Sequence, residues 1–421
     1  MLRFYNGKIM SFENGLKLTD DELWTDGGII SYIGPSRADA PVFEREIDLK
    51  GDVLMPGFKN AHTHTGMTFL RSAADDLPLH QWLNEEIFPR EARLTDEAVY
   101  YFTKLGIMEY LSTGVTANFD MYYRNDYYTA ACRDSGFRTV MCSSMNNYDK
   151  DPENIEREFL KFHSADGMTG YTLGLHAEYT TSLERIEYMV SLIEKYKAPA
   201  FIHLEETKSE TEDCIKRYGM TPAAFLSSIG FFKYGGGGFH CVWFTDEDIE
   251  LFARKGLYVV TCPASNLKLA SGIAPITRMQ KAGINIAIGT DGPSSNNALD
   301  MFREMYLVTV LQKYACNDAA ACPAEDVLEM ACVNGAKCIG LDDCSDLQVG
   351  KKADMIVIDL NRPNMQPVLN IPKNLVYSGS KENVRMTVIN GKILYENGEF
   401  YIGESAEDVY KNCAEILKKI S

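Results

Sequence analysis

Two histidines that stand two residues apart, His62 and His64, carry the clearest chemical signal in this sequence. They follow an apolar run, Val53-Leu54-Met55-Pro56, of the kind that forms a buried β-strand. Residues i and i+2 of a strand point to the same face, so the two imidazoles should project together. Two imidazoles on one face provide half of a transition-metal site. Two solvated histidines at a strand end would have the same spacing, so the pair does not settle the matter alone.

Further polar residues follow other apolar segments in the same way: His176, His203 with Glu206 three residues later, His240, and Asp291. One such histidine alone would indicate a structural residue, but several at matched positions predict a shared site. Three neutral imidazoles and one carboxylate suit a divalent ion, with zinc as the default and iron or manganese as alternatives. Such an ion with an open position activates water near neutral pH.

A hydrolase of this type also needs a group that carries the proton of the water. Glu206 can accept that proton and return it to a ring nitrogen or a leaving amine, and His240 can hold the hydroxide or the tetrahedral centre. A binuclear site would need a bridging group at the fourth strand, commonly a carboxylated lysine. The string Gly174-Leu-His-Ala-Glu-Tyr179 offers no lysine there. We therefore expect one metal ion per chain.

A repeating strand–helix pattern carries these residues through the middle of the chain. The apolar strand segments are Val53–Ala61, Gly114–Asp120, Arg138–Ser144, Tyr171–Ala177, Pro199–Leu204, Gly237–Val242, Leu257–Cys262 and Ile284–Thr290. The amphipathic segments include Thr95–Thr113, Leu183–Tyr196, Thr221–Ile229, Asp246–Lys255 and Ala274–Ala282. This pattern predicts an α/β fold, a (β/α)8 TIM-like barrel. The polar residues then lie at the C-terminal ends of the strands, where barrel active sites are assembled.

The two ends of the chain read as short β-strands with turn signals such as Asn14-Gly15 and Asn390-Gly391. Both ends could meet in one small β-sandwich. We expect residues 1–54 and 348–421 to form this composite domain, with a C-terminal amphipathic helix at Ala406–Ile420. Residues 55–347 would form the metal-dependent catalytic barrel.

Composition excludes several classes of function. The net charge of −17 argues against a nucleic acid or an anionic membrane as partner. The N-terminus lacks the apolar region of a secretory signal, and no stretch has the apolar length of a membrane span, which predicts a cytoplasmic protein. Eleven cysteines occur without any Cys-x-x-Cys pair, as is typical of reduced structural thiols. The expected partner is a small molecule, and a homo-oligomer is compatible with the sequence.

Several longer strings resemble the amidohydrolase superfamily, and most closely its 5′-methylthioadenosine/S-adenosylhomocysteine deaminase group. The motif residues His62-Thr-His64, His203-x-x-Glu206, His240 and Thr290-Asp-Gly292 occur in the order of that superfamily, and the resemblance covers nearly the whole chain. The strings that favour the deaminase group are Ala74-Asp-Asp-Leu-Pro-Leu-His-Gln-Trp-Leu83, Phe88-Pro-Arg-Glu-Ala-Arg-Leu-Thr95, Asn266-Leu-Lys-Leu-Ala-Ser-Gly-Ile-Ala-Pro275 and Ser295-Asn-Asn-Ala-Leu-Asp-Met-Phe302.

The resemblance implies a function and a role for each site residue. His62, His64, His203 and Asp291 would hold the metal, and Glu206, His240 and Asp291 would be catalytic. Three residues would bind substrate. His176 would contact the purine, Glu91 would accept hydrogen bonds from the ribose hydroxyls, and Glu206 would bind substrate as well. Trp82 would form an apolar wall near the base, although simple helix packing explains it equally well. The implied reaction is hydrolytic deamination of an adenosine-type nucleoside to the inosine analogue plus ammonia.

One departure from the group concerns the 5′ substituent. Members that act on S-adenosylhomocysteine carry an arginine near the end of the third strand, where this chain has Ser143. Arg138 lies at the wrong end of that strand, and Arg157 follows in the next segment. A neutral 5′ group, as in methylthioadenosine, 5′-deoxyadenosine or adenosine, is therefore easier to accommodate than a charged homocysteine tail. The sequence alone does not choose the substituent, the metal or the oligomeric state.

Two other hypotheses of function compete with nucleoside deamination. The first is an aminohydrolase of another heterocycle, such as guanine, 8-oxoguanine, pterin, cytosine or an s-triazine, or an amide- or ring-opening hydrolase. Glu91 separates bases from nucleosides, because a free base has no ribose diol to satisfy a buried carboxylate. The second is a non-catalytic scaffold on the same fold, which the complete set of ligand positions disfavours.

Overall fold

In the computed structural model of this chain, eight strands form one parallel sheet in which spatial order follows chain order. The structure describes every residue except 74, 78–80, 164–166 and 421, so parts of the Ala74–Leu83 string quoted above lie outside the described residues. The strands of this sheet are β8 (Phe58–Thr63), β9 (Val115–Met121), β10 (Arg138–Cys142), β11 (Thr169–Ala177), β12 (Ala200–Leu204), β13 (Gly236–His240), β14 (Tyr258–Thr261) and β15 (Asn285–Ile288).

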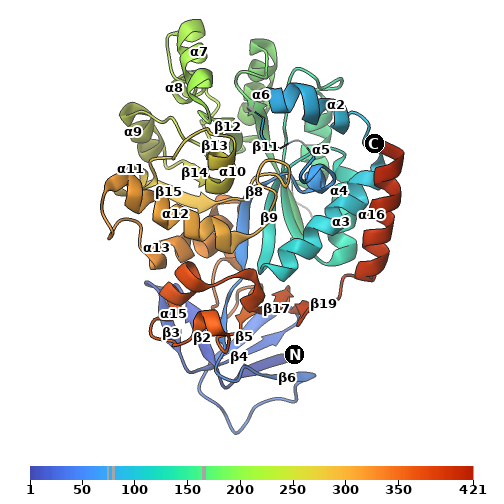
Figure 1. The fold of residues 1–421 in the computed structure, drawn as a ribbon, viewed down its shortest axis with the longest axis vertical. Helices are drawn as coiled ribbons and strands as arrows, with labels where there is room; N and C mark the ends of the chain where they lie inside the picture. Colours follow the sequence, from blue (N-terminus) through green and yellow to red (C-terminus); the bar gives the residue numbers. More distant parts are fainter. Residues whose placement is uncertain (74, 78–80, 164–166, 421) are drawn as a thin grey trace.

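The sheet closes on itself between β8 and β15. The backbone N–H of Asp291 donates to the carbonyl of His62 at 3.0 Å. The Asn60 amide bonds both the backbone N–H and the hydroxyl of Thr290, at 2.9 and 2.7 Å. Helices lie on the outside of this ring (Figure 1), which confirms the predicted (β/α)8 barrel.

The α-helices of the barrel lobe range in length from 4 residues, in α2, to 17 residues, in α3. They are α2 (Phe88–Glu91), α3 (Asp96–Ser112), α4 (Asn125–Ser135), α5 (Asn154–Phe162), α6 (Leu183–Tyr196), α7 (Lys208–Tyr218), α8 (Pro222–Ser228), α9 (Asp246–Lys255), α10 (Pro263–Lys268), α11 (Ile276–Lys281), α12 (Met301–Cys316), α13 (Ala324–Glu329) and α14 (Gly335–Cys338). Among the described residues, no helix combines the length and the apolar character that a bilayer crossing requires.

The terminal segments form two further sheets that pack on one another. The four-stranded sheet holds β1 (Leu2–Tyr5), β4 (Glu22–Asp26), β5 (Ile29–Gly34) and β6 (Arg45–Asp48). The seven-stranded sheet holds β2 (Lys8–Ser11), β3 (Lys17–Thr19), β7 (Val53–Pro56), β16 (Met355–Ile358), β17 (Val384–Ile389), β18 (Lys392–Glu396) and β19 (Glu399–Phe400). One apolar core joins Phe4, Leu23 and Ile47 of the first sheet to Leu54, Met355 and Val388 of the second. The predicted small sandwich built from both chain ends is therefore confirmed.

The predicted first strand, Val53–Ala61, is wrong in one respect, because it is two strands rather than one. β7 pairs with β16 and β2 in the sandwich, whereas β8 begins the barrel. The chain passes from one lobe to the other at Gly57. A Cβ atom there would lie 2.1 Å from the Thr116 side chain, so only glycine permits this crossing.

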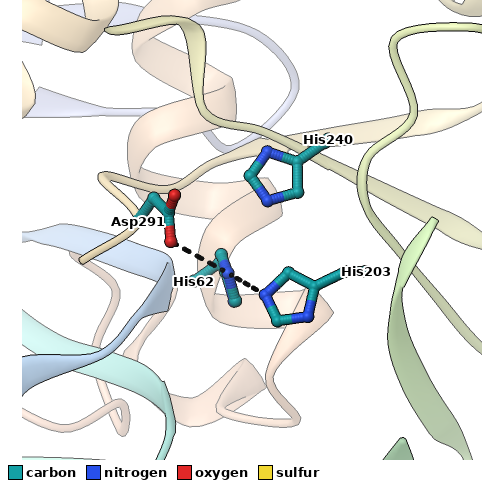
Figure 2. A group of neighbouring side chains, drawn as sticks. All are labelled: His62, His203, His240 and Asp291. Carbon is teal, nitrogen blue, oxygen red and sulfur yellow. Dashed lines mark hydrogen bonds and ion pairs between the residues drawn. The ribbon is translucent and has the colours of Figure 1, made fainter. Parts of the chain in front are cut away.

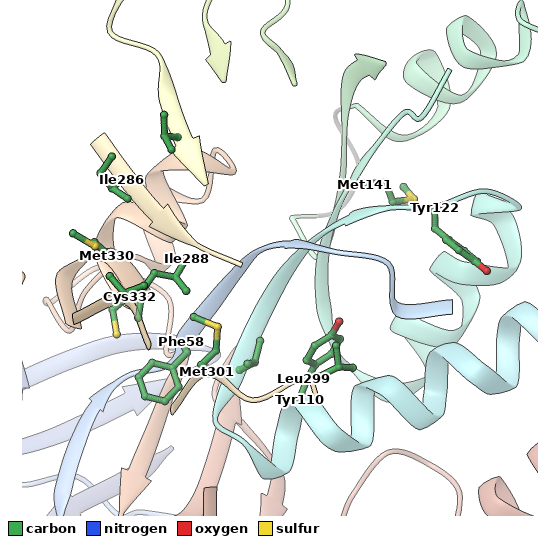
Figure 3. Close-up of a cluster of buried hydrophobic side chains, with 14 of the residues drawn as sticks. Phe58, Tyr110, Tyr122, Met141, Ile286, Ile288, Leu299, Met301, Met330 and Cys332 are labelled. Carbon is green, nitrogen blue, oxygen red and sulfur yellow. The ribbon is translucent and has the colours of Figure 1, made fainter. Parts of the chain in front are cut away.

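Buried apolar side chains fill the barrel and the layer between its sheet and its helices. Inside the ring, Phe119, Phe201 and Phe239 pack on one another. Outside it, Ile286 and Ile288 of β15 lie beside Met330 and Cys332, which follow α13 (Figure 3). This arrangement leaves the C-terminal ends of the strands as the place where polar side chains can gather.

The C-terminal helix α16 (Ala406–Ile420) has the predicted bounds and returns from the sandwich to the barrel, where it lies along α3 (Figure 1). The Lys104 ammonium of α3 pairs with Glu404 at 2.6 Å just before α16 begins. The short helix α15 (Ile371–Lys373) covers the other side of the junction between the lobes.

A buried ion pair ties the floor of the barrel to the sandwich. The Arg138 guanidinium, at the start of β10, donates two hydrogen bonds to the Asp354 carboxylate at 2.6 and 3.0 Å, and both side chains are fully buried. The Asp354 carboxylate also accepts the backbone N–H of Asn390 at 2.7 Å. Lys59 is buried nearby, where burial lowers its pKa and its ammonium bonds the Gly57 carbonyl and the Thr116 hydroxyl, each at 2.8 Å.

Removing one partner of this pair should be far more costly than removing a partner of an exposed pair. We expect Asp354→Asn to lower the free energy of unfolding by about 3–5 kcal/mol, because a buried guanidinium loses its counter-charge. Asp151→Asn, which breaks the exposed pair with Arg157, should cost less than about 1 kcal/mol. Urea unfolding of the two variants measures both values. Equal small losses would show that the pair does not hold the lobes together.

Candidate active site

Five histidines and one aspartate lie at the C-terminal ends of the barrel strands. The Nε2 atom of His203 lies 3.1 Å from Nε2 of His62 and 3.3 Å from Nε2 of His64. The Oδ1 atom of Asp291 lies 3.2 Å from Nε2 of His64 and 3.5 Å from Nε2 of His62. Ligand atoms of His62, His203, His240 and Asp291 all lie within 4.8 Å of one another (Figure 2).

These separations fit a single divalent cation. A tetrahedral zinc site with bonds of about 2.1 Å has edges of about 3.4 Å between its ligand atoms, which matches the spacing of the four inner atoms. His64 and His203 each use Nδ1 to donate to a carbonyl oxygen, of Met121 and of His176, both at 2.6 Å. In their neutral forms these two rings therefore present Nε2 lone pairs to the same point. Buried acceptor atoms that face one another need a cation between them.

The carboxylate of Asp291 is held so that one oxygen faces this point. Its Oδ2 atom accepts hydrogen bonds from the hydroxyls of Ser265 and Ser295, at 2.5 and 2.7 Å. The backbone of Asp291 is left-handed, with φ 59°, which turns the side chain inward just after β15. Oδ1 is left for the histidine rings.

Burial also sets the charges of the imidazoles. It lowers the pKa of His62 to about 3 and lowers the pKa of His203 well below its ordinary value, so both rings are neutral. Burial is also the largest single influence on His64 and would lower its pKa. The hydrogen bond and charge of Asp291, the Met121 carbonyl and the charge of Asp120 together outweigh it and raise that pKa to about 9. A metal ion entering the site would displace this one proton, as metal ligation generally does.

Glu206 and His240 lie side by side next to these four residues. The Oε2 atom of Glu206 is 3.9 Å from Nε2 of His240, and its Oε1 accepts the Ser271 hydroxyl at 3.3 Å. His240 donates Nδ1–H to the side-chain oxygen of Asn266 at 2.7 Å, which leaves Nε2 facing the cavity. Burial raises the pKa of Glu206. The raised pKa favours uptake of a proton by this carboxyl group, as a general base requires.

The loop that carries Glu206 is fixed from behind. The carboxylate of Glu210, in α7, accepts the backbone N–H groups of Glu205 and Glu206, both at 2.9 Å. Glu205 points away from the cavity, and its Oε1 atom accepts the Ala223 N–H at 3.0 Å at the start of α8. The two adjacent glutamates thus serve different parts of the structure.

A cavity of about 700 Å³ opens above the histidines. Its wall includes three buried polar atoms that make no well-formed hydrogen bond: Oε1 of Glu91, the hydroxyl of Tyr122 and Nε1 of Trp82. The Glu91 carboxyl and the Tyr122 hydroxyl are near enough to interact with each other. Burial raises the pKa of Glu91 to about 7. Arg90 pairs with Glu86 rather than with Glu91. Unpartnered buried polar groups around one cavity indicate a polar ligand that would complete their hydrogen bonds.

His176 lies between the ligand cluster and the aromatic wall of the cavity. Its Nδ1 is 3.0 Å from the Thr180 hydroxyl, and burial lowers its pKa to about 4, so the ring is neutral. Its ring centroid lies 4.9 Å from that of His203 and 6.4 Å from that of Phe88. This ring is placed to meet a planar ligand without adding charge.

The serine that replaces the expected arginine is not in the cavity. The Ser143 hydroxyl donates to the Gly174 carbonyl at 2.8 Å and accepts its N–H at 2.6 Å, so it joins β10 to β11. Arg157 pairs with Asp151 and lines a separate depression of about 280 Å³. Within the described part of the chain, the lysine and arginine side chains that line the main cavity are Arg124 and Lys150.

Several residues that support the site could not be identified from the sequence. They are Tyr122, Ser265, Asn266, Ser295 and Glu210. Three of them lie inside or beside strings that the sequence singled out, but hydroxyl and amide side chains are too common in loops to indicate a site by themselves. Their roles emerge only from what they contact.

Comparison with known proteins places this arrangement in a family. The model of the amidohydrolase family matches residues 53–394. A 5-methylthioadenosine/S-adenosylhomocysteine deaminase of Moorella thermoacetica is 38% identical over 400 residues, which cover 93% of this chain and 92% of the relative. The protein of the same name from Syntrophomonas wolfei is 38% identical over 413 residues, covering 96% and 94%.

Solved structures show the same fold over the full chain. The crystal structure of a zinc-bound adenosine deaminase from Xanthomonas campestris superposes with a TM-score of 0.94 at 32% identity and covers 100% of this chain and 98% of its own. A zinc-bound atrazine chlorohydrolase from Arthrobacter aurescens, at 22% identity and a TM-score of 0.91, shares the fold over 99% of this chain and 100% of its own. Because the family model spans most of the sequence and runs through every residue of the histidine–aspartate cluster, this chain belongs to the amidohydrolase family.

Proposed function

We propose that this protein is a metal-dependent aminohydrolase that deaminates an adenosine-type nucleoside to the matching inosine analogue and ammonia. The observation that carries the proposal is the composition of one cavity. His64, His203 and Asp291 of the proposed metal site lie among its lining residues with Glu206, and so does Glu91, whose buried Oε1 atom makes no well-formed hydrogen bond. The names of the relatives support an adenosine-type substrate, with 5′-methylthioadenosine, 5′-deoxyadenosine, adenosine and S-adenosylhomocysteine as candidates.

In this proposal His62, His64, His203 and Asp291 hold one divalent ion, most simply zinc. When bound, the ion supplies Lewis-acid activation of water at neutral pH. His64 is chosen over His240 as the third imidazole, because its Nε2 lies 3.3 Å from that of His203 and 3.2 Å from the Asp291 carboxylate. His240 has its own partner in Asn266 and stands beside Glu206.

Glu206 is proposed to move the protons of the reaction. The water gives its oxygen to the purine carbon that bears the amino group, and the amine leaves as ammonia. Glu206 takes a proton from the water and delivers one to the ring nitrogen or to the leaving amine. Its raised pKa lets it hold that proton between the two transfers. His240 donates or accepts a hydrogen bond at the attacking oxygen, and the neutral His176 faces the purine.

Glu91 is proposed to bind the ribose diol. A carboxylate with an unpartnered oxygen is the expected acceptor for two adjacent hydroxyls. Tyr122 and Trp82 offer an additional hydroxyl and an indole N–H to the same ligand. This set distinguishes a nucleoside from guanine, cytosine or an s-triazine, because a free base would leave the Glu91 carboxylate buried and unpaired.

An ammonia-release assay on the zinc-loaded protein tests the reaction class directly. We expect ammonia from adenosine-type nucleosides and none from guanine or cytosine. Chelation should abolish the release, and titration with zinc should restore it fully at one ion per chain, because the proposed site offers one set of four ligand atoms. Restoration that needs two ions per chain would contradict the mononuclear site, and release from free bases alone would contradict the nucleoside substrate.

Glu206→Gln should keep the metal and the substrate but lower kcat by about 10²–10⁴-fold, because a carboxamide cannot carry the proton. Glu205→Gln is the matched control, since the neighbouring carboxylate contacts α8 and not the cavity. Steady-state kinetics and zinc content of the folded fraction measure the difference. Wild-type turnover in Glu206→Gln would exclude the proposed proton route.

Glu91→Ala should lower kcat/KM for the best nucleoside by at least about tenfold, since charge-assisted hydrogen bonds contribute roughly 1.5–3 kcal/mol each and 1.4 kcal/mol is a factor of ten. The same change should have little effect on a 2′,3′-dideoxy analogue, which lacks both hydroxyls. Glu86→Ala, which removes only the pair with Arg90, serves as control. Equal losses on both substrates would remove Glu91 from ribose binding and favour a free base.

A further inference from the structure

A buried polar network lies behind the metal-ligand cluster, on the outer face of the barrel wall. Within β8 and β9 the side chains alternate, so His62 and Phe119 face the inside of the ring while Thr63 and Asp120 face the helices outside. Thr63, Thr65, Tyr110, Asn118, Asp120 and Tyr128 form this network, and all six are fully buried. The proposed function assigns no role to any of them.

Asp120, near the end of β9, is the acceptor at the centre of the network. Its carboxylate accepts the backbone N–H of Thr65 at 3.1 Å and also the Thr65 hydroxyl. It further accepts the Asn118 amide at 3.1 Å and the Tyr128 hydroxyl at 3.0 Å. Among the described residues, no lysine or arginine forms an ion pair with Asp120, although its side chain is fully buried. Such a carboxylate is costly to bury unless it serves a nearby positive charge.

Two consecutive residues of β9 position His64, one through its ring and the other through the backbone that follows it. The Met121 carbonyl accepts Nδ1–H of the His64 ring at 2.6 Å, which fixes the orientation of the imidazole. The Asp120 carboxylate binds the backbone and the hydroxyl of Thr65, the next residue after His64, which fixes the chain that carries the ring. The β8–β9 pairing is irregular between Asn60 and Thr63, so ladder hydrogen bonds alone do not fix this segment.

The same network continues to the second side of the metal-ligand cluster. The Tyr110 hydroxyl, from α3, lies 2.8 Å from the hydroxyls of both Thr65 and Thr63. The Thr63 hydroxyl donates to the backbone carbonyl of Asp291 at 3.0 Å. Asp120 is thus bonded directly to the residue after His64, and a row of hydroxyl contacts through Thr65, Tyr110 and Thr63 extends from it to the backbone of Asp291.

We propose that Asp120 is a positioning residue for the metal site: through Thr65 it fixes the backbone at His64, and its carboxylate adds a fixed negative charge behind the ligands. Both effects favour a divalent cation over an empty cluster, because partners of this kind orient ligands and raise their affinity. This inference rests on the metal site of the proposed function. It adds a residue that touches neither metal nor substrate.

Asp120→Asn tests the inference. The amide places an NH₂ group against donors from Thr65 and Tyr128, so the hydrogen bonds and the charge are lost together. We expect the affinity for zinc, measured by competition with a chromophoric chelator, to fall at least about tenfold. The visible spectrum of the cobalt-substituted protein should change as well, because the His64 ring is no longer held.

Asp346→Asn is the matched control for burial and chemistry. Asp346, between α14 and β16, is a buried carboxylate that accepts the N–H groups of Phe12 and Leu347 at 3.0 and 2.8 Å, far along the chain from the ligands. It should lower thermal stability while leaving the zinc affinity unchanged. Thr65→Val, which keeps the side-chain shape and removes only the hydroxyl, should weaken zinc binding severalfold and provides the test if Asp120→Asn does not fold.

The outcomes separate the two proposals. If the wild-type protein binds no zinc, the proposed function fails. If the wild type binds zinc and both Asp120→Asn and Thr65→Val bind it equally well, the proposed function stands and only the positioning role of Asp120 is overturned. A lower melting temperature with unchanged zinc affinity would likewise reduce Asp120 to a purely structural residue.

Discussion

The structure depends on holding four acceptor atoms within about a hydrogen-bond length of one another in a buried place. Nε2 of His203 lies 3.1 Å from Nε2 of His62, and Oδ1 of Asp291 lies 3.5 Å from the same nitrogen. Lone pairs at such distances repel one another unless a proton or a metal ion lies between them. Local chain propensity cannot sustain such a cluster. It persists because the parallel strands converge at one end and because His64, His203 and Asp291 are held from behind by carbonyl or hydroxyl groups.

The surroundings of the cluster follow from the same constraint. Below it, Phe239 stacks on the His62 ring at 3.8 Å and closes the inside of the barrel with apolar side chains. Above it, the cavity wall presents hydrogen-bonding groups that have no protein partner. This cavity therefore gives water and substrate access to the cluster. Apolar side chains on one side of the cluster and polar groups on the other suit a reaction in which a single water must attack a single ring carbon.

Much of this could be predicted from the sequence, because the informative patterns are local. An apolar run that ends in a histidine indicates both a strand and the end of that strand. The barrel, and the positions of four histidines at its strand ends, could therefore be predicted: His62, His176, His203 and His240. The break of the first strand at Gly57 could not be predicted, because it depends on the side chain of Thr116, far along the chain. Asp120 and Asn266 were missed for the same reason. Their importance lies in contacts with other segments, and neither residue type is unusual at its position.

The seven-stranded sheet combines strands from both ends of the chain, which affects how the protein folds during its synthesis. β7 lies between β2, which is synthesised early, and β16, which is synthesised after the entire barrel. Asp354 leaves the ribosome 216 residues after Arg138, so a nascent barrel carries this buried guanidinium without its counter-charge. Domains usually fold as units while synthesis proceeds, at about 5–20 residues per second. Here residues 354–400 supply a charge and strands that the first part of the chain needs, so the buried ion pair and the seven-stranded sheet can be completed only after those residues have been synthesised.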